Sequence, residues 1–338
     1  MAMIDAEMMG GPDQRARTTV DAPFARALLR LGEAREDVVG LSADLSKYTD
    51  IGPFSERYPE RFFQMGMAEA NMMGVAGGLA RVGYVPFVTT YGVFASRRAF
   101  DQVAMSIALG RANVKIVAFL PGLTTPGGPT HQAIEDLSML RALPNMVVID
   151  PADGLELEQA TEAIAAYDGP VYMRGLRGTV PVVLPADYRF EIGVARLLRE
   201  PASGDASGGV DIGLISTGVM TERALDAADL VAAEGPSVAV LHASTLKPFD
   251  GAAVLALARR ATVLVTVENG TVIGGLAGTV SETLARAGGA PPLLPLGVQD
   301  QFPQAGSLDY LLEQYGLTGP QIAKSAMAAL AARLLAEG

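Results

Sequence analysis

A chain of 338 residues that is 49% hydrophobic is long enough to form two compact domains, each with its own buried core. Its formal net charge of −11 argues against nucleic acid as a partner, because such binding depends on clustered lysines and arginines. The chain has no cysteine, which excludes disulfides and thiolate metal sites and is compatible with a reducing cytoplasm. We therefore expect a globular cytoplasmic protein.

The first 17 residues are expected to form a mobile tail, because they lack the basic start and apolar run of a signal peptide. No stretch approaches the ~20 uninterrupted apolar residues that a membrane-spanning helix needs, so no membrane association is expected. From residue 18 to 190, short β-branched or aromatic runs alternate with amphipathic helical patterns. The runs predict buried parallel strands at Val38–Ser42, Phe62–Gln64, Val85–Val88, Val114–Leu120, Met146–Ile149 and Val171–Met173.

A polar, glycine-rich stretch at Glu200–Gly209 marks the predicted domain boundary, and we assign residues 191–210 to a linker. Beyond it, residues 211–338 repeat the alternation and predict a second, smaller domain. Its expected strands are Ile212–Ser216, Ser237–Leu241, Val263–Val267 and Leu293–Leu296. The predicted fold class is therefore α/β with two doubly wound domains.

Loops that follow parallel strands are where ligands bind in such folds, so their side chains are the first candidates for function. Asp44 lies in a small-residue turn after the first strand and is by itself an ordinary helix cap. Glu69 opens a helix that otherwise contains Met, Ala and Gly. It either complements the helix macrodipole or is a half-buried acid with a chemical role.

Two further loops carry candidate side chains. Tyr91, Phe94 and Arg97 recur at a spacing of three, which predicts one helical face that is either core or a platform for stacking a ligand. His131 ends a long loop rich in Gly and Pro at residues 121–132. A surface helix cap is the simpler reading of this histidine, but the irregular loop favours a proton donor or a ligand for a substrate hydroxyl.

Several known constellations are absent from the sequence. There is no GxxxxGK[ST] phosphate loop, and the run Gly274–Gly278 does not match the dinucleotide fingerprint. The two histidines, His131 and His242, are too few and too far apart to suggest a transition-metal site. No GxSxG elbow is present, so a hydrolase triad is not supported.

Taken together and in order, the four loops resemble the pyrimidine-binding and C-terminal domains of transketolase. The resemblance covers nearly everything after residue 17, and its most specific blocks are Gly66–Gly78, Arg98–Gln102, Gly128–Gln132, Glu135–Leu137 and Arg141–Asn145. It implies thiamine diphosphate as the cofactor. The acid matching Glu69 would hydrogen-bond the aminopyrimidine and promote its imino form, which then deprotonates the thiazolium carbon. That role needs a protonated carboxyl, which a desolvated site provides.

The same resemblance assigns roles to the other candidates. Tyr91 and Phe94 would pack on the aminopyrimidine, with Arg97 in the place of a third ring neighbour. Met67 and Asp44 would lie close to the cofactor. By the same resemblance, His131 would contact the substrate near its reacting carbonyl, and Arg177 would bind a substrate phosphate, which suits the planar guanidinium.

The sequence also departs from full-length transketolases. Ala70 replaces a histidine that often follows the acid, Gly127 stands where many members have an aspartate that reads a donor hydroxyl, and Phe119 stands where a further substrate histidine is common. The identity of the sugar donor therefore stays open.

The Gly-Asp-Gly run and later Asn that hold Mg²⁺ and the diphosphate in this family are missing, so no metal site is expected here. We expect an N-terminal, diphosphate-binding (alpha) subunit to supply it, in a heterotetramer of two pairs. The C-terminal domain, including Glu268 and the turn Thr245–Pro248, is assigned by resemblance to self-association and subunit contacts.

The implied activity is transfer of a two-carbon ketol unit between sugar phosphates. Alternatives are a beta subunit of a 2-oxo acid dehydrogenase, a relative of deoxyxylulose phosphate synthase, and a non-catalytic scaffold. The block Gly128–Gln132 favours transketolase over the dehydrogenase, and the synthase normally keeps its metal half on the same chain. Retention of Glu69, Tyr91, Phe94 and His131 together argues against a scaffold.

Overall fold

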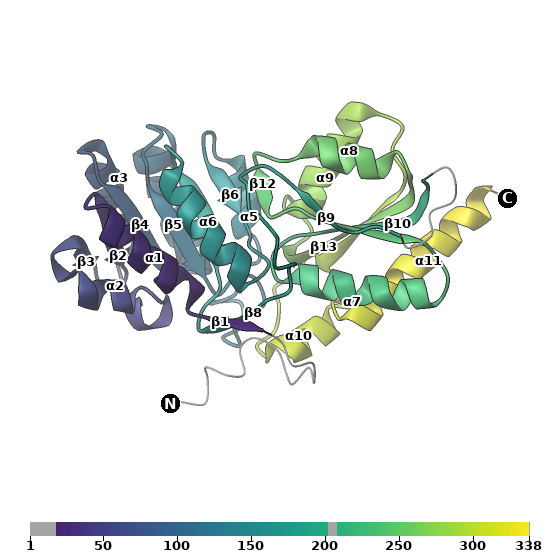
Figure 1. Ribbon diagram of the computed structural model, residues 1–338, viewed down its shortest axis with the longest axis horizontal. Helices are drawn as coiled ribbons and strands as arrows, with labels where there is room; N and C mark the ends of the chain where they lie inside the picture. Colours follow the sequence, from purple (N-terminus) through teal and green to yellow (C-terminus); the bar gives the residue numbers. More distant parts are fainter. Residues whose placement is uncertain (1–17, 202–207, 338) are drawn as a thin grey trace.

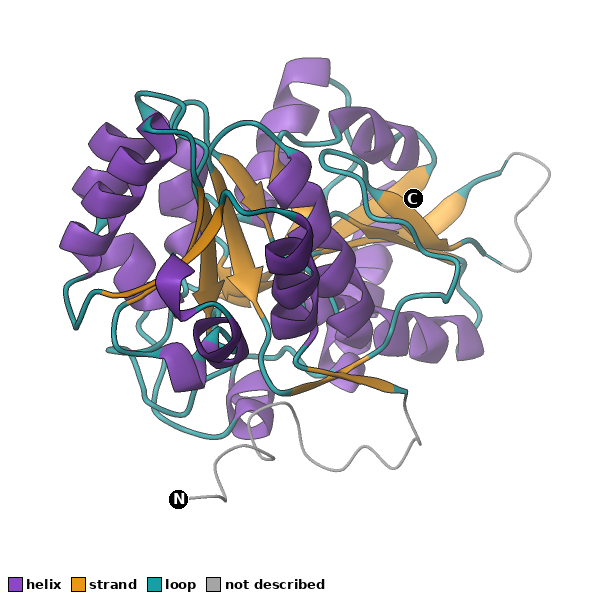
Figure 2. Cartoon of the chain, turned by 60° about the vertical axis from the view of Figure 1, so that its left-hand side comes forward, coloured by secondary structure: helices purple, strands orange, loops and turns teal. Residues whose placement is uncertain are grey.

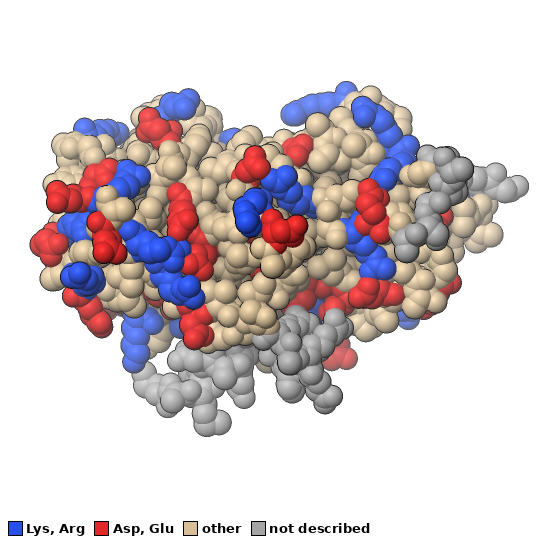
Figure 3. Space-filling model, in the orientation of Figure 1, with Lys and Arg blue, Asp and Glu red and all other residues tan. Residues whose placement is uncertain are grey.

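Two α/β lobes lie side by side in the computed structural model (Figure 1), which describes residues 18–201 and 208–337. The predicted tail at residues 1–17 and part of the predicted linker, residues 202–207, lie outside the described residues. No helix of the described chain is long and apolar enough to cross a membrane. On the face drawn in Figure 3, acidic and basic side chains are interspersed over both lobes.

The first lobe is built on a seven-stranded sheet with the order β12-β6-β7-β5-β4-β2-β3. Every neighbouring pair is parallel except β12, which runs antiparallel to β6. The strands are β2 (Val38–Ser42), β3 (Phe62–Gln64), β4 (Val85–Tyr91), β5 (Lys115–Phe119), β6 (Val147–Ile149), β7 (Val171–Gly175) and β12 (Thr245–Lys247). The prediction of burial was wrong for β3, because this strand is at the sheet edge and Phe63 is 38% exposed.

Helices cover both faces of this sheet (Figure 2). One face packs against α1 (Pro23–Ala34), α2 (Gly52–Arg57) and α6 (Gly154–Ala166). The other packs against α3 (Glu69–Arg81), α4 (Phe100–Gln102), η4 (Val103–Ala108) and α5 (Asp136–Ala142). Phe24 of α1 anchors the first face, with its ring centroid 5.5 Å from that of Phe119. Short turns η1 (Ser46–Tyr48), η2 (Pro59–Arg61) and η3 (Phe94–Arg98) complete the lobe.

The second lobe has a five-stranded sheet with the order β14-β13-β10-β11-β9. Its strands are β9 (Arg196–Arg199), β10 (Val210–Ser216), β11 (Val238–His242), β13 (Ala261–Thr271) and β14 (Leu293–Val298). One side packs against α7 (Met220–Ala233), α10 (Leu308–Gln314) and α11 (Gly319–Glu337), and the other against α8 (Gly251–Ala258) and α9 (Leu276–Ala287). The doubly wound α/β prediction is confirmed for both lobes.

The lobes are more interwoven than the sequence suggested. Strand β9 lies in the segment expected to be a linker and joins the second sheet, whereas β12 leaves the second lobe to extend the first sheet. A two-stranded ribbon of β1 (Thr19–Asp21) and β8 (Thr179–Pro181) borders the first lobe. The expected subunit contact of Glu268 needs correction here, because this residue is 1% exposed within the chain itself. In the turn at 245–248, Thr245 and Leu246 are also buried, whereas Lys247 is partly buried and Pro248 is exposed.

A buried charge network centred on Arg174 of β7 joins the lobes. Its guanidinium pairs with Asp136 at 2.5 Å and Asp150 at 3.3 Å, and donates to the carbonyl of Asn269 in β13 at 3.0 Å. Tyr172 also donates to Asp136, at 2.6 Å. Burial raises the pKa of Asp150 to about 6 even though the Arg174 charge opposes that shift. We call this network of Arg174, Asp136, Asp150, Tyr172 and the Asn269 carbonyl the buried lock, because its polar contacts connect the two sheets.

A second buried pair crosses the same boundary. His242 of β11 lies with its Nε2 2.9 Å from the carboxylate of Glu156 in α6, and its Nδ1 is 2.8 Å from the Thr221 hydroxyl. Burial opposes protonation of His242, but the Glu156 carboxylate raises the pKa of the imidazole above its usual range. The Glu156 carboxylate therefore favours the protonated form of this imidazole.

The contribution of three buried groups to the stability of the isolated chain is expected to fall as pH rises from 6 to 8. The pKa values of His242, Asp150 and Glu268 are all raised in the folded state, the last to about 7 because of burial. Each group therefore binds its proton more tightly when folded, and its contribution is lost as pH rises through the folded pKa. Lys115 acts in the opposite direction, because burial lowers its pKa to about 7, so comparing the unmodified chain with a variant isolates the effect of Glu268. We expect the contribution of Glu268 to the free energy of unfolding to fall by about 1 kcal/mol, measured by urea titration at both pH values.

The variant Glu268→Gln, which cannot titrate, should show a shallower loss between these pH values. Glu60→Gln, at an exposed position, should match the unmodified chain. Equal slopes for all three proteins would contradict this explanation of the pH dependence.

Candidate functional site

The predicted site residues follow five strands that are neighbours in the first sheet, in the order β7-β5-β4-β2-β3. Because these strands are parallel, their carboxyl ends meet at one edge. That edge is where ligands bind in open α/β sheets. The residues, in the order of these strands, are Arg177, His131, Tyr91 with Phe94 and Arg97, Asp44, and Met67 with Glu69.

Glu69 is the first residue of α3, and its side chain is 4% exposed. A turn at Gly66, where φ is +69°, leads the chain from β3 into this helix. The carboxylate accepts a hydrogen bond from Arg98 at 3.3 Å. Met67, two residues earlier, is 76% exposed. A buried acid therefore lies two residues from an exposed apolar side chain.

Two aromatic rings form a flat wall beside this acid. Tyr91 ends β4 and Phe94 begins η3, and their centroids are 5.8 Å apart with the planes inclined by 26°. Both rings are only partly buried, which leaves ring surface available for stacking. Burial raises the pKa of the Tyr91 phenol, and the positive charge of Arg177 partly offsets the shift. Arg177 thus faces this wall from the end of β7.

The turn η3 is a π-helical turn, which contains one more residue than an α-helical turn. As a result Arg98, not Arg97, lies over the Phe94 ring, with its guanidinium carbon 3.9 Å from the centroid. Arg97 points instead to the loop after β5, where it binds Glu135 and the carbonyls of Pro129 and Gln132. Arg98 is the site residue that the sequence analysis missed, because a spacing of three assumes a regular helix.

His131 closes the site from the loop after β5. Its ring meets Phe94 and Tyr91 edge-on, with centroid distances of 5.5 and 6.5 Å. The Nδ1 atom is 2.9 Å from the Thr130 hydroxyl, which fixes the ring orientation. The imidazole, the two rings and Glu69 are therefore brought together in the fold, although they are widely spaced in the sequence.

Asp44 and Arg177 lie at the rim of this arrangement. Asp44 is exposed, has φ of +60°, and donates its backbone N–H to the Gln64 side chain at 2.7 Å, which ties the loops after β2 and β3 together. The Arg177 guanidinium is 6.0 Å from the Tyr48 ring in η1. In the part of the chain that the structure describes, no cluster of three His, Asp or Glu side chains could hold a metal ion.

The site can bind a flat heterocycle that carries hydrogen-bonding ring nitrogens. The rings of Tyr91 and Phe94 offer a stacking surface, Met67 offers an exposed apolar side chain, and Glu69 offers a carboxyl group with most of its water removed. These features fit the aminopyrimidine half of thiamine diphosphate.

The fold and this edge of the sheet define a two-domain α/β protein with a candidate site for a flat ring. The chain belongs to the transketolase family. Residues 17–182 match the transketolase pyrimidine-binding domain and residues 205–322 match the transketolase C-terminal domain. The family predicted from the sequence is thereby confirmed.

Two curated relatives match almost along their full length. The chain is 50% identical to a transketolase family protein of Sinorhizobium fredii, covering 93% of this chain and 89% of the relative. It is 41% identical to a 6-deoxy-6-sulfo-D-fructose transketolase subunit of a Clostridium species, covering 90% and 92%. A 1-deoxy-D-xylulose-5-phosphate synthase of Syntrophotalea carbinolica is 38% identical, but the match spans only 46% of that protein.

Among solved structures, a split gene transketolase described as an inactive beta4 tetramer matches with a TM-score of 0.82 at 41% identity. The match covers 91% of this chain and 97% of that chain. Transketolase from Campylobacter jejuni has the same fold, with a TM-score of 0.76 at 20% identity over 49% of its own chain. The chain thus shares its fold with about half of a full-length transketolase and is similar to nearly the whole of a split gene product.

Proposed function

We propose that this chain is the C-terminal subunit of a thiamine diphosphate-dependent split transketolase. It moves a two-carbon ketol unit between sugar phosphates and is active only with an N-terminal, diphosphate-binding subunit. The observation that carries the proposal is the buried Glu69 carboxyl beside the stacked Tyr91 and Phe94 rings, with His131 meeting those rings edge-on.

Glu69, Tyr91, Phe94 and Met67 would hold the aminopyrimidine ring, with Asp44 at the rim. Bound thiamine diphosphate would supply the nucleophilic carbon and the electron sink that carbon–carbon cleavage requires. The task of this chain would be to orient the ring and to offer it the Glu69 carboxyl, which Arg98 contacts at 3.3 Å, as a hydrogen-bonding and proton-exchanging group.

His131 and Arg177 would act on the substrate. The imidazole of His131 can exchange a proton with a sugar hydroxyl or carbonyl oxygen, and it is already oriented by Thr130. The guanidinium of Arg177 can hold the distal phosphate through a two-pronged contact. Arg97 would act as a structural support for the His131 loop, through its bonds to Glu135 and to loop carbonyls.

The partner subunit is supported by two relatives that this chain matches along most of their length. One is named a transketolase subunit and the other is titled as a split gene product. We propose a heterotetramer of two pairs in which the partner binds Mg²⁺ and the diphosphate, and in which C-terminal domains mediate self-association in the cytoplasm.

The proposal is tested by assembling the chain with the product of a neighbouring gene that encodes a diphosphate-binding subunit. The mixture should transfer ketol units from a ketose phosphate to an aldose phosphate, whereas neither protein alone should. Formation of deoxyxylulose phosphate by the mixture would instead support the synthase, the alternative favoured by the 38% identical relative.

His131→Asn should lower kcat/KM for the sugar phosphate in the assembled enzyme by about 100-fold or more, because the proton-exchanging group is lost. The affinity for thiamine diphosphate, measured by calorimetry, should not change. The neighbouring Thr130→Val, which removes only the orienting hydroxyl, should have a smaller effect. A large loss of cofactor affinity in His131→Asn would contradict a role limited to the substrate.

A further inference from the structure

The loop that carries His131 is held at both ends by the C-terminal domain. Leu123, near the start of the loop, and Ile134, just after its end, are both buried in the core of the second lobe, among side chains of β10, β13 and α7. The backbone N–H of Thr271, at the end of β13, donates to the carbonyl of Ile134 at 2.8 Å. A substrate loop of the first lobe is therefore fixed to the second.

Asn269 of β13 makes the contact at the start of the loop. Its side-chain oxygen accepts from the Leu123 N–H at 2.8 Å, and its side-chain nitrogen donates to the Pro121 carbonyl at 3.0 Å. The residue is 1% exposed. Between these two contacts, Gly122 has φ of +54°, and a Cβ there would lie 2.2 Å from the Asn269 carbonyl oxygen. The absence of a side chain at Gly122 therefore lets the loop pass close to both oxygens of Asn269.

The amide of Asn269 suits this place because it donates and accepts at once without charge. Arg174 of the buried lock donates to the Asn269 backbone carbonyl at 3.0 Å and to the Ala133 carbonyl at 3.3 Å. The same network therefore fixes the strand that carries Asn269 and the far end of the loop.

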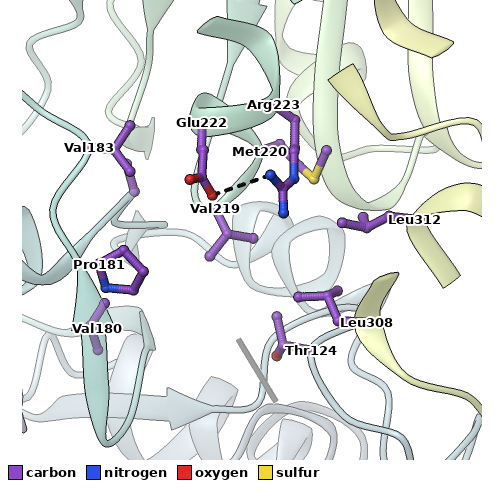
Figure 4. A pocket seen from close by; sticks show the side chains of 11 residues that line it. Thr124, Val180, Pro181, Val183, Val219, Met220, Glu222, Arg223, Leu308 and Leu312 are labelled. Atoms are coloured by element: carbon purple, nitrogen blue, oxygen red, sulfur yellow. Dashed lines mark ion pairs between the residues drawn. The ribbon is translucent and has the colours of Figure 1, made fainter. Parts of the chain in front are cut away.

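Two further contacts hold the part of the loop around His131. Gln132 donates to the Gln304 carbonyl of the second lobe at 3.0 Å, and a Cβ at Gly127 would be 2.9 Å from the Cβ of His131. Behind the loop, Thr124 faces Leu308 and Leu312 across a cavity of about 30 Å³ (Figure 4). That volume holds little more than a water molecule, so it is too small for a sugar phosphate.

We propose that Asn269 is a positioning residue for His131, through which the C-terminal domain sets the geometry of substrate binding. A shift of about 1 Å in a group that contacts substrate can lower the rate about 100-fold. Loss of the contacts that hold the loop could therefore lower the rate even though the imidazole of His131 is still present. The catalytic consequence rests on the proposed function, but the structural link between Asn269 and the loop does not.

The structural link is tested on the isolated full chain by hydrogen exchange. Asn269→Ala should speed exchange of the Leu123 amide and of the loop at residues 121–133 by about tenfold or more, because the Leu123 N–H loses its acceptor. Thr266→Val is the matched control. It removes a buried side-chain hydroxyl from the same strand, β13. The described residues provide no hydrogen-bond partner for this hydroxyl, so its loss should leave loop exchange unchanged.

If Asn269→Ala does not fold, Asn269→Asp keeps the acceptor for Leu123 and loses the donor to Pro121. It should speed loop exchange by a smaller factor. Loop exchange equal to that of the unmodified chain in a folded variant would overturn the proposal, whether or not the protein proves to be a transketolase.

The catalytic link is tested in the assembled enzyme. Asn269→Ala should lower kcat with sugar phosphate by ~100-fold while its dissociation constant for thiamine diphosphate stays unchanged, and it should add little to the loss already caused by His131→Asn. Full additivity of the two substitutions, or an equal loss of cofactor affinity, would show that Asn269 does not act through His131. Absence of ketol transfer in the unmodified complex would instead count against the proposed function.

Discussion

Glu69→Gln in the assembled complex is expected to reduce ketol transfer by about 100- to 10,000-fold, the range associated with loss of a positioned acid or base. The substitution keeps the shape of the side chain but removes its ability to hold and release a proton. Glu69 begins α3 beside the open aromatic wall, so the change should leave the fold intact. Initial rates of ketol transfer at saturating cofactor measure the effect.

The control for this experiment is Glu162→Gln, which removes a half-exposed carboxylate that pairs with Arg30 on the outer helices. It should retain full activity. Both variants, and Glu69→Ala, should still assemble with the partner subunit in size-exclusion chromatography. Full ketol transfer by Glu69→Ala would contradict the role assigned to this residue. If the chain is a non-catalytic scaffold, neither the variants nor the unmodified protein should transfer ketol units.

Arg174→Met should destabilise the isolated chain by about 3–5 kcal/mol, because it leaves the buried carboxylates of Asp136 and Asp150 without a counter-ion. Methionine preserves the apolar stem and fills much of the same volume. The free energy of unfolding, from urea titration followed by circular dichroism, measures the loss.

Arg30→Met is the matched control on the surface. Its guanidinium pairs with Glu158 at 2.7 Å and Glu162 at 2.6 Å where solvent screens the charges, so its loss should cost less than about 1 kcal/mol. Similar losses in the two variants would show that the buried lock contributes no more to stability than an ordinary surface pair.

The strands that the sequence predicted are those whose apolar runs are long enough to be recognised without knowing their neighbours. β2 and β3 begin and end where predicted, and the core strands of the second sheet differ from the prediction by a few residues at their ends. Strands β9 and β12 could not be predicted, because each is defined by pairing with a distant segment. Their pairing is also what interweaves the two lobes.

The part of the candidate site that could be predicted consists of residues in the loops after the predicted strands. The sequence named Glu69, Tyr91, Phe94 and His131 as candidates because loops after parallel strands meet at one edge, and the structure brings these four residues together. Arg98 was missed because the π-helical turn breaks the regular helical spacing. The residue types of this segment do not indicate that the turn contains an extra residue. The contacts of Asn269 with Pro121 and Leu123 could not be predicted from the sequence, because they join positions far apart along the chain.

The most direct test of the split-enzyme proposal is a calorimetric titration of thiamine diphosphate with Mg²⁺ into the purified chain, alone and then mixed with the diphosphate-binding subunit. Tight binding in the mixture and not with the chain alone is the predicted result. Equally tight binding to the chain alone, or no binding in the mixture, would contradict it.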